Sequence, residues 1–410
     1  MDLMVSLALT ALGVVSLLLL WAEGLLRKTR HLAAAVFFIC VAMGLRAVCM
    51  SHVTADYTQF LVVWVDRLRA GGGFSALGGN IGSNYNFPYL YFLAAISYSK
   101  EYSLYLIKLF SIAFDVLLAW SVMRITGLFS KSANRRMFAF LGTLLLPTVI
   151  LNGAYWGQCD CIYAALAVLS LYLALKGRPW LAMVFAALSF SFKLQAIFFL
   201  PVFAVFLFTK RLKIRHLLAF PATYVVTLLP ALLFGQPFWG ALTLYYSQAD
   251  SIGNSLNYSS PSLFAMLNIP GYEPLLSDIG ISLALLFMVG VWAALYFRRK
   301  QVSNLVLLCT ALLMVIGVPF FLPRMHDRYF FMADALSFAL AVVLPKYLPV
   351  PVFCSFASLL GYYAYLQGRY LLPMYVGAIA LILALVFCLV CLKGHLGRRN
   401  QRLSDAAASG

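Results

Sequence analysis

Long apolar runs alternate with short basic segments along nearly the whole chain. The runs at 3–25 and 32–50 predict a helical hairpin whose turn carries Arg27, Lys28 and Arg30. A membrane-spanning helix needs about 20 apolar residues, which both runs supply. Because basic loops stay on the cytoplasmic side, we expect this turn inside and both ends of the hairpin outside. The first run lacks the basic start of a signal peptide, so we expect it to remain as a helix.

The same alternation continues to the end of the chain and predicts an all-α polytopic membrane protein with about thirteen transmembrane helices. Two of the runs, 180–192 and 194–209, are short, and we expect a hairpin whose tip lies below the membrane surface. The basic loops place the N-terminus outside and the C-terminus inside. Besides the first hairpin, the expected helices are 104–125, 137–154, 161–176, 180–192, 194–209, 217–235, 280–297, 302–322, 330–345, 350–366 and 370–392.

We expect one transmembrane domain over residues 1–402, followed by a disordered tail at 403–410. Two long outer loops interrupt it, at 51–103 and 236–279. Within the first loop, the apolar piece 87–103 is short and rich in tyrosine. If it crossed the membrane, the basic cluster after the next helix would fall outside, so we interpret it as a juxtamembrane or re-entrant helix.

Composition narrows the class of protein. Hydrophobic residues make up 63% of the 410 positions, charged residues only 10%, and the mean hydropathy is +0.92, which excludes a soluble domain of this size. The net charge of +17 is dispersed among membrane loops, so we expect no nucleic-acid partner. The eight cysteines lie mostly in apolar runs and read as small core residues. The Cys-x-Cys motif formed by Cys159 and Cys161 is too short to indicate a metal site. The sequence indicates neither a cofactor nor a divalent metal.

Unusual polar residues gather on the expected outer side, whereas the cytoplasmic loops are plain Lys and Arg. One outward-facing polar cavity would explain this sorting, and a carboxylate at the edge of a membrane helix is costly unless it has a role. The alternative is an ordinary solvated loop. The outer segments are Asp56 with the cluster 84–88, the stretch 156–160, Lys193 with Gln195, the loop 247–262, and the stretch 324–329.

Several of these residues have a structural alternative. Asp160 either caps the helix that begins near Cys161 or takes part in function. Lys193, at the tip of a short hairpin, needs an anionic partner, which is either Asp160 or a ligand phosphate. The segment His326-Asp327-Arg328 is either functional or an interfacial anchor.

Glycosyl transfer from a polyprenyl-phosphate sugar suits such a cavity. The lipid tail of the donor stays in the bilayer, and its phosphate leaves as an anion that Lys and Arg stabilise. An Asp takes the proton of the acceptor hydroxyl as that hydroxyl attacks the anomeric carbon. No nucleotide-binding glycine-rich loop is needed for this reaction, and the sequence contains none.

Six stretches in a fixed order resemble the GT-C superfamily of integral-membrane glycosyltransferases, in particular bacterial mannosyltransferase-like members that use polyprenyl-phosphate sugars. The resemblance covers about residues 30–345. It implies that Asp56 is the catalytic base and that juxtamembrane helices of the first loop shape the acceptor site. One departure is the extra helix before the acidic loop. The stretches are Asp56-Tyr57, NYNFPYLYFL at 84–93, NGAYWGQCDCIYA at 152–164, SFKLQAIFFLP at 191–201, LNYSSPSLFAML at 256–267 and PRMHDRYFF at 323–331.

The sequence therefore predicts an inverting glycosyltransferase that moves a hexose, mannose-like, from a polyprenyl phosphate to a glycan or lipid-linked acceptor. It would act at the outer face of a bacterial inner membrane. We expect Asp56 to be the base, and Lys193, Arg328 and His326 to bind the donor phosphate. Asp66 is a second candidate acid, more consistent with a surface pair beside Arg67. Expected substrate contacts are Tyr57, Asn86, Gln158, Asp160, Gln195, Tyr258 and Asp327.

Two other functions remain open from the sequence. One is a polymerase or ligase that uses a glycan linked to polyprenyl diphosphate. The other is a flippase or transporter of lipid-linked sugars, which should carry ionisable residues at the bilayer midplane and inverted repeats.

Overall fold

The computed structural model describes residues 3–99, 101–245, 253, 255–267 and 269–396. Over these residues the chain is built from helices joined by short connections, with two very short strands. The expected tail at 403–410, part of the expected loop 247–262, and Lys100 lie outside the described residues. The chain divides into two compact units: the first comprises residues 1–170, 183–196 and 218–252, and the second comprises 171–182, 197–217 and 253–410.

Eight helical segments within the described residues are long and apolar enough to cross a membrane, and a bent pair makes a ninth. The prediction of an all-α polytopic membrane protein is therefore confirmed at this level. The number thirteen stays a prediction, since it requires four of the five shorter apolar helices to cross as well. The eight segments are Leu3–Ala22, Thr29–Cys49, Ser103–Phe129, Ile214–Leu233, Glu273–Phe297, Asn304–Phe321, Pro345–Gln367 and Met374–Leu396; the shorter ones are Phe87–Ile96, Asp160–Leu175, Pro179–Phe192, Leu194–Phe208 and Phe331–Val343.

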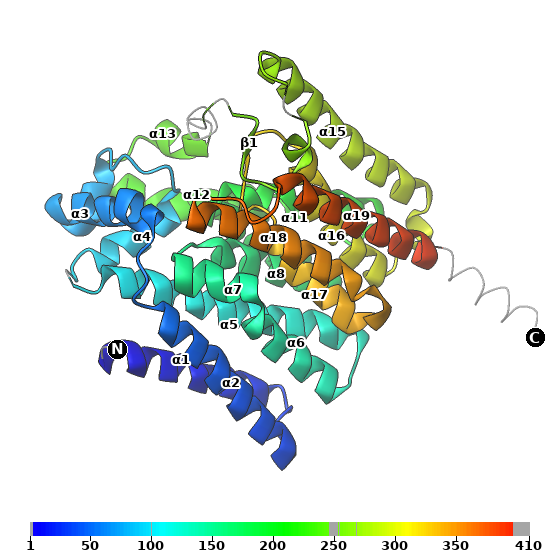
Figure 1. The fold of residues 1–410 in the computed structure, drawn as a ribbon, viewed down its shortest axis with the longest axis horizontal. Helices are drawn as coiled ribbons and strands as arrows, with labels where there is room; N and C mark the ends of the chain where they lie inside the picture. Colours follow the sequence, from blue (N-terminus) through cyan, green and yellow to red (C-terminus); the bar gives the residue numbers. More distant parts are fainter. Residues whose placement is uncertain (1–2, 100, 246–252, 254, 268, 397–410) are drawn as a thin grey trace, which may run out of the picture. The chain divides into compact units, whose positions relative to one another are not determined.

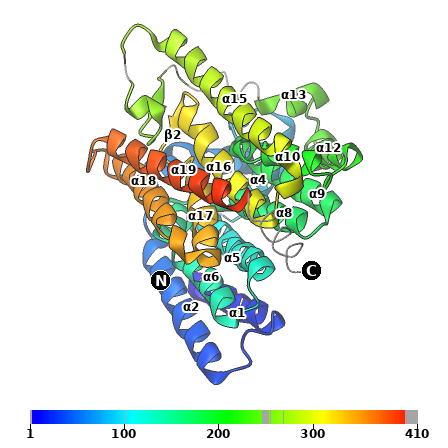
Figure 2. The same ribbon diagram turned by 90° about the vertical axis from the view of Figure 1, so that its right-hand side faces the viewer.

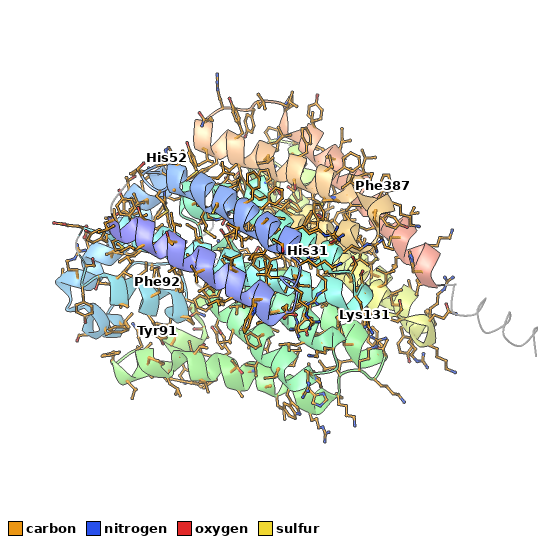
Figure 3. The ribbon with its side chains drawn as sticks, turned by 90° about the horizontal axis from the view of Figure 1, so that it is seen from below. His31, His52, Tyr91, Phe92, Lys131 and Phe387 are labelled. Atoms are coloured by element: carbon orange, nitrogen blue, oxygen red, sulfur yellow. The ribbon has the colours of Figure 1, made fainter. Side chains whose placement is uncertain are left out.

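The first unit begins with a helical hairpin, α1 and α2, which lie side by side (Figure 1). His31 and His52 mark the two ends of α2 (Figure 3). At the basic turn, Glu23 forms ion pairs with Arg124 and Arg136. The elements of this unit are α1 (Leu3–Ala22), α2 (Thr29–Cys49), the π-helical turn η1 (Tyr57–Leu61), α3 (Val62–Ala70), the 3-10 turn η2 (Gly73–Gly78), α4 (Phe87–Ile96), α5 (Ser103–Phe129), α6 (Ala133–Leu145), α7 (Pro147–Ile150), the π-helical turn η3 (Leu151–Trp156), α12 (Ala219–Leu233) and α13 (Phe238–Leu242).

The expected helix 137–154 is bent by 46° between α6 and α7. Leu146 precedes Pro147 and has a ψ of 126°, because the proline ring disfavours the α conformation in the residue before it. After the bend the chain continues into η3, whose wider turn ends at Gly157. Gly157 has a φ of +79°, a left-handed conformation that favours glycine. The chain therefore reverses sharply just before Gln158.

The first outer loop is folded, as η1, α3, η2 and α4, and is not an extended connection. Helix α4 contacts η2, α3 and α12 within the first unit. Asn86 begins α4: its side-chain oxygen accepts a hydrogen bond from the Phe87 backbone N–H at 2.8 Å, and Pro88 follows in the first turn. The interpretation of α4 as a juxtamembrane or re-entrant helix stays a prediction.

Three elements straddle the boundary between the units: α8 (Asp160–Leu175), α9 (Pro179–Phe192) and the 3-10 turn η4 (Leu194–Phe198). In the second unit, α16 is the most buried of the candidate spans; α17 and α19 pack against it, and α18 packs against α17 and α19 (Figure 2). The further elements are α10 (Val202–Phe208), α11 (Ile214–Leu217), β1 (Asn257–Tyr258), η5 (Leu263–Ala265), α15 (Glu273–Phe297), η6 (Arg299–Gln301), α16 (Asn304–Phe321), β2 (Met325–His326), α17 (Phe331–Val343), η7 (Pro345–Tyr347), α18 (Pro349–Gln367) and α19 (Met374–Leu396).

The two strands of the second unit were not expected. β1 and β2 run parallel, with Asn257 opposite Met325 and Tyr258 opposite His326. They join the second outer loop to the segment that follows α16. Two-residue strands leave no hydrophobic alternation in the sequence, so periodicity could not predict them.

Candidate active site

Asp56 lies at the start of the first outer loop, and a buried lysine fixes the chain just before it. Lys108 of α5 donates hydrogen bonds from Nζ to the carbonyl oxygens of Cys49 (2.9 Å), Met50 (3.1 Å) and His52 (2.6 Å). The last carbonyls of a helix lack intrahelical partners, and a lysine that binds them ends the helix. Because Lys108 is fully buried, it anchors the end of α2 and the turn that leads to Asp56.

The Asp56 carboxylate is nearly buried, with 8% of the residue exposed, and two side chains hold one of its oxygens. Trp156 Nε1 donates to Asp56 Oδ2 at 2.8 Å, and Gln158 Nε2 donates to the same oxygen. Thr54 Oγ1 donates to the Trp156 carbonyl at 3.0 Å, which ties the two segments together a second time. These two hydrogen bonds fix the orientation of the carboxylate, as a general base requires.

Asp160, two residues after Gln158, forms a buried ion pair with Lys193. Lys193 Nζ lies 2.5 Å from Asp160 Oδ1, and Asn152 Nδ2 donates to Asp160 Oδ2 at 2.8 Å. Only 6% and 0% of the two charged side chains are exposed. The structure thus pairs Lys193 with Asp160, the first of the two anionic partners considered from the sequence. Lys193 Nζ also lies 5.7 Å from the centre of the Tyr85 ring, within range of a cation–π contact.

Three other predicted residues also lie in the first unit. Asn86 is fully buried, caps α4 and donates from Nδ2 to Tyr224 Oη at 3.1 Å. Tyr57 Oη and Ser103 Oγ share a hydrogen bond of 2.8 Å. Gln195 is buried, and its Oε1 accepts no hydrogen bond from the described residues.

Asp66, the second candidate acid, lies on the surface. Its side chain is 57% exposed and forms an ion pair with Arg69 at 2.5 Å, one turn along α3. A surface pair was expected, but with Arg67 as the partner. Arg67 instead donates to the Ile81 carbonyl at 2.8 Å, because residues three apart on a helix face each other and adjacent ones do not.

The remaining predicted residues lie together in the second unit. The Tyr258 ring stacks on His326, with centroids 4.6 Å apart and planes 8° from parallel. Asp327 is buried, and Arg328 Nη1 lies 3.3 Å from its Oδ1. A Cβ atom at Gly361 would lie 2.6 Å from the Asp327 carbonyl oxygen, so α18 approaches this segment more closely than any other residue would allow.

The sequence reasoning missed several polar residues inside the expected helices. Arg46 of α2 and Asp115 of α5 form an ion pair at 2.8 Å with both side chains fully buried. Lys108 was not singled out either, and Trp156 was included in the outer stretch 156–160 without a role of its own. Charged residues inside a transmembrane segment are themselves a signal of a role, and Arg46, Lys108 and Asp115 carry that signal in the sequence. Trp156 carries none that distinguishes it from other interfacial tryptophans.

His52 follows α2 and stacks on Tyr155, with ring centroids 3.8 Å apart. Burial, together with the nearby positive charge of Lys108, holds the pKa of His52 below its ordinary value. Across the described residues, no group of three or more His, Cys, Asp or Glu side chains is arranged to hold a metal ion.

Comparison with known protein families gives a match. The model of glycosyltransferase family 87 matches residues 85–323, more than half of the chain. The matched range includes Gln158, Asp160 and Lys193, whereas Asp56 and His326 lie outside it. No curated protein matches the chain significantly.

Proposed function

Because the chain belongs to glycosyltransferase family 87, we propose that it transfers a hexose, mannose-like, from a polyprenyl-phosphate carrier to an acceptor hydroxyl. The acceptor is a glycan or a lipid-linked molecule, and the reaction takes place at the outer face of a bacterial inner membrane. Family membership favours a transferase over a flippase. The apolar helices supply the bilayer location that a polyprenyl tail requires.

The observation that carries this proposal is the orientation of the Asp56 carboxylate by Trp156 and Gln158. In the proposed reaction the acceptor oxygen forms a bond to the anomeric carbon. The bond from that carbon to the phosphate oxygen breaks, and its electron pair leaves with the polyprenyl phosphate. The acceptor proton passes to Asp56. One base and one direct displacement invert the configuration of the anomeric carbon.

The leaving phosphate requires cations, and we propose Lys193, Arg328 and His326 for that role. Arg328 supplies a planar fork that fits two phosphate oxygens, and Lys193 supplies a compact charge. The stacking of His326 on Tyr258 holds the imidazole in one orientation. The ion pairs to Asp160 and Asp327 place both cations before the donor binds, and preorganised charge is what stabilises a developing anion.

The test is transfer of radiolabelled hexose from its polyprenyl phosphate by the purified protein in nanodiscs, with a membrane glycolipid extract as acceptor. Asp56→Asn should lower turnover by about 10²- to 10⁴-fold, the usual contribution of a general base. Asp66→Asn is the matched control, because it removes an exposed carboxylate from the same loop and should leave turnover near the wild-type level. Near-normal activity in Asp56→Asn would refute the assignment of the base. Movement of the donor across the bilayer without transfer would refute the proposed function.

A further inference from the structure

Gln158 presents a second chemical group beside the proposed base. Its side-chain nitrogen donates to Asp56 Oδ2, and only 4% of the residue is exposed. Its carbonyl oxygen, Oε1, is buried and accepts no hydrogen bond from any residue that the structure describes. A buried carbonyl without a donor costs free energy, so this one is a candidate for a ligand contact.

The orientation of this amide is fixed. If the amide turned over, its carbonyl oxygen would face the Asp56 carboxylate, and two acceptors would repel each other. The backbone of Gln158 is held on both sides: its N–H donates to the Asn152 carbonyl at 2.9 Å, and its carbonyl accepts from Ser111 Oγ at 2.7 Å. Gln158 therefore keeps its nitrogen on Asp56 and its side-chain carbonyl without a donor among the described residues.

We propose that Gln158 Oε1 accepts a hydrogen bond from a second hydroxyl of the acceptor, on the carbon next to the attacked hydroxyl. The proposal rests on the proposed function and names the class of its acceptor: a vicinal diol, as on a sugar ring, and not the lone hydroxyl of a serine or threonine. A hydrogen bond joins the Gln158 amide to Asp56, so the amide carbonyl lies next to the proposed base. The attacked hydroxyl gives its proton to Asp56, while the second hydroxyl keeps its proton and only donates a hydrogen bond.

This arrangement predicts that the site discriminates against an acceptor that lacks the second hydroxyl. A binding site that offers a buried acceptor to a ligand hydroxyl rejects the analogue without that hydroxyl, because the buried group is then left unpaired. The cost of one unpaired buried group corresponds to a loss of about 10- to 100-fold in kcat/KM.

The first experiment identifies the acceptor in native membranes. Labelled hexose is transferred to endogenous acceptors, and linkage analysis determines the residue that carries it. We expect a sugar with a free hydroxyl next to the new linkage. Transfer to an isolated hydroxyl of a lipid-linked acceptor would overturn the inference and leave the proposed function intact. Transfer to serine or threonine would overturn both the inference and the proposed acceptor, and no transfer by the wild-type protein would refute the proposed function itself.

The second experiment uses the decyl glycoside of that sugar and its analogue deoxygenated next to the attacked carbon. Wild-type protein should lose about 10- to 100-fold in kcat/KM on the deoxygenated glycoside. Gln158→Met should be slower on both glycosides but should show little further loss on the deoxygenated one, because the carbonyl is gone. Trp156→Phe is the matched control: it removes a donor from the same Asp56 oxygen but keeps the Gln158 carbonyl, so the full loss should remain.

The comparison separates recognition of the diol from positioning of the base. If kcat/KM falls by the same factor on the deoxygenated glycoside in wild type and in Gln158→Met, Gln158 does not bind the second hydroxyl, and the inference is wrong. If Trp156→Phe also abolishes the difference, the discrimination belongs to the orientation of Asp56, and the inference is wrong for that reason.

Discussion

Neutralising the buried Lys193–Asp160 pair, singly and together, distinguishes a structural lysine from one that also binds phosphate. The two charged atoms lie 2.5 Å apart, with 6% and 0% of the side chains exposed. Removing one partner of such a pair leaves an uncompensated buried charge and costs about 3–5 kcal/mol. We therefore expect Lys193→Gln and Asp160→Asn each to lower the stability of the protein by an amount of this order. The double variant, which leaves two neutral amides, should recover most of that loss.

The activity of the double variant shows whether Lys193 also binds the donor phosphate. If Lys193 also contacts the donor phosphate, the recovered protein still lacks a charge-assisted hydrogen bond, which contributes about 1.5–3 kcal/mol. At 1.4 kcal/mol per tenfold change, the donor should be used about 10- to 150-fold less efficiently. Stability is measured by thermal unfolding in detergent, and kcat and KM for the polyprenyl-phosphate sugar are measured in nanodiscs.

Recovery of both stability and donor use in the double variant would refute a role of Lys193 in phosphate binding. If Lys193→Gln with Asp160→Asn restores donor use along with stability, Lys193 is a structural ion-pair residue and has no part in phosphate binding. Asn152→Ala is a useful control, because it removes a neutral donor to Asp160 without touching the lysine. It should weaken stability modestly and leave the donor KM unchanged.

Three further predictions follow from other contacts. Arg46→Met or Asp115→Leu alone should destabilise the protein by about 3–5 kcal/mol, while the double replacement should recover most of that loss in thermal unfolding. The folded state holds the pKa of His52 below 6.5, so the imidazole resists protonation in the folded protein. The His52 contribution to stability should therefore be complete above pH 6.5 and should be lost as the pH falls below that value, and His52→Gln should flatten this dependence. A cysteine at the exposed Ser75 should react with a membrane-impermeant thiol reagent from outside, and one at the exposed Lys131 should not; the opposite labelling would reverse the topology.

The hydrophobic pattern predicted most of the helices, because the bilayer imposes a length and a polarity on each. The expected helix 302–322 corresponds to α16, Asn304–Phe321. The expected helix 280–297 was too short: α15 begins at Glu273, seven residues earlier. Glu273, Pro274, Ser277 and Asp278 make its first turns polar, and Pro is favoured at the start of a helix. A polar helical end that extends beyond the bilayer leaves no hydropathy signal.

The polar interior was predicted much less well, because it depends on contacts between residues far apart in the chain. Hydropathy averages over a window, so one lysine among apolar neighbours barely changes it. Lys108 was passed over in this way, although its three bonds to carbonyl oxygens end α2. Asp160 shows the same limit: capping and pairing were both reasonable from the sequence, and only the folded chain brings Lys193, 33 residues away, to its carboxylate.

The proposed role of Asp56 and its observed orientation thus come from different levels of the chain. The sequence indicates the role, since an acidic residue at the start of the first outer loop has few structural uses there. The orientation requires Trp156 and Gln158, about 100 residues away, to meet one oxygen of that carboxylate. They reach it because Pro147 bends the helix before them and Gly157 turns the chain between them. A substitution at either of those backbone positions should therefore disturb the base without touching it, and a tolerated Pro147→Ala or Gly157→Ala with wild-type turnover would contradict this account.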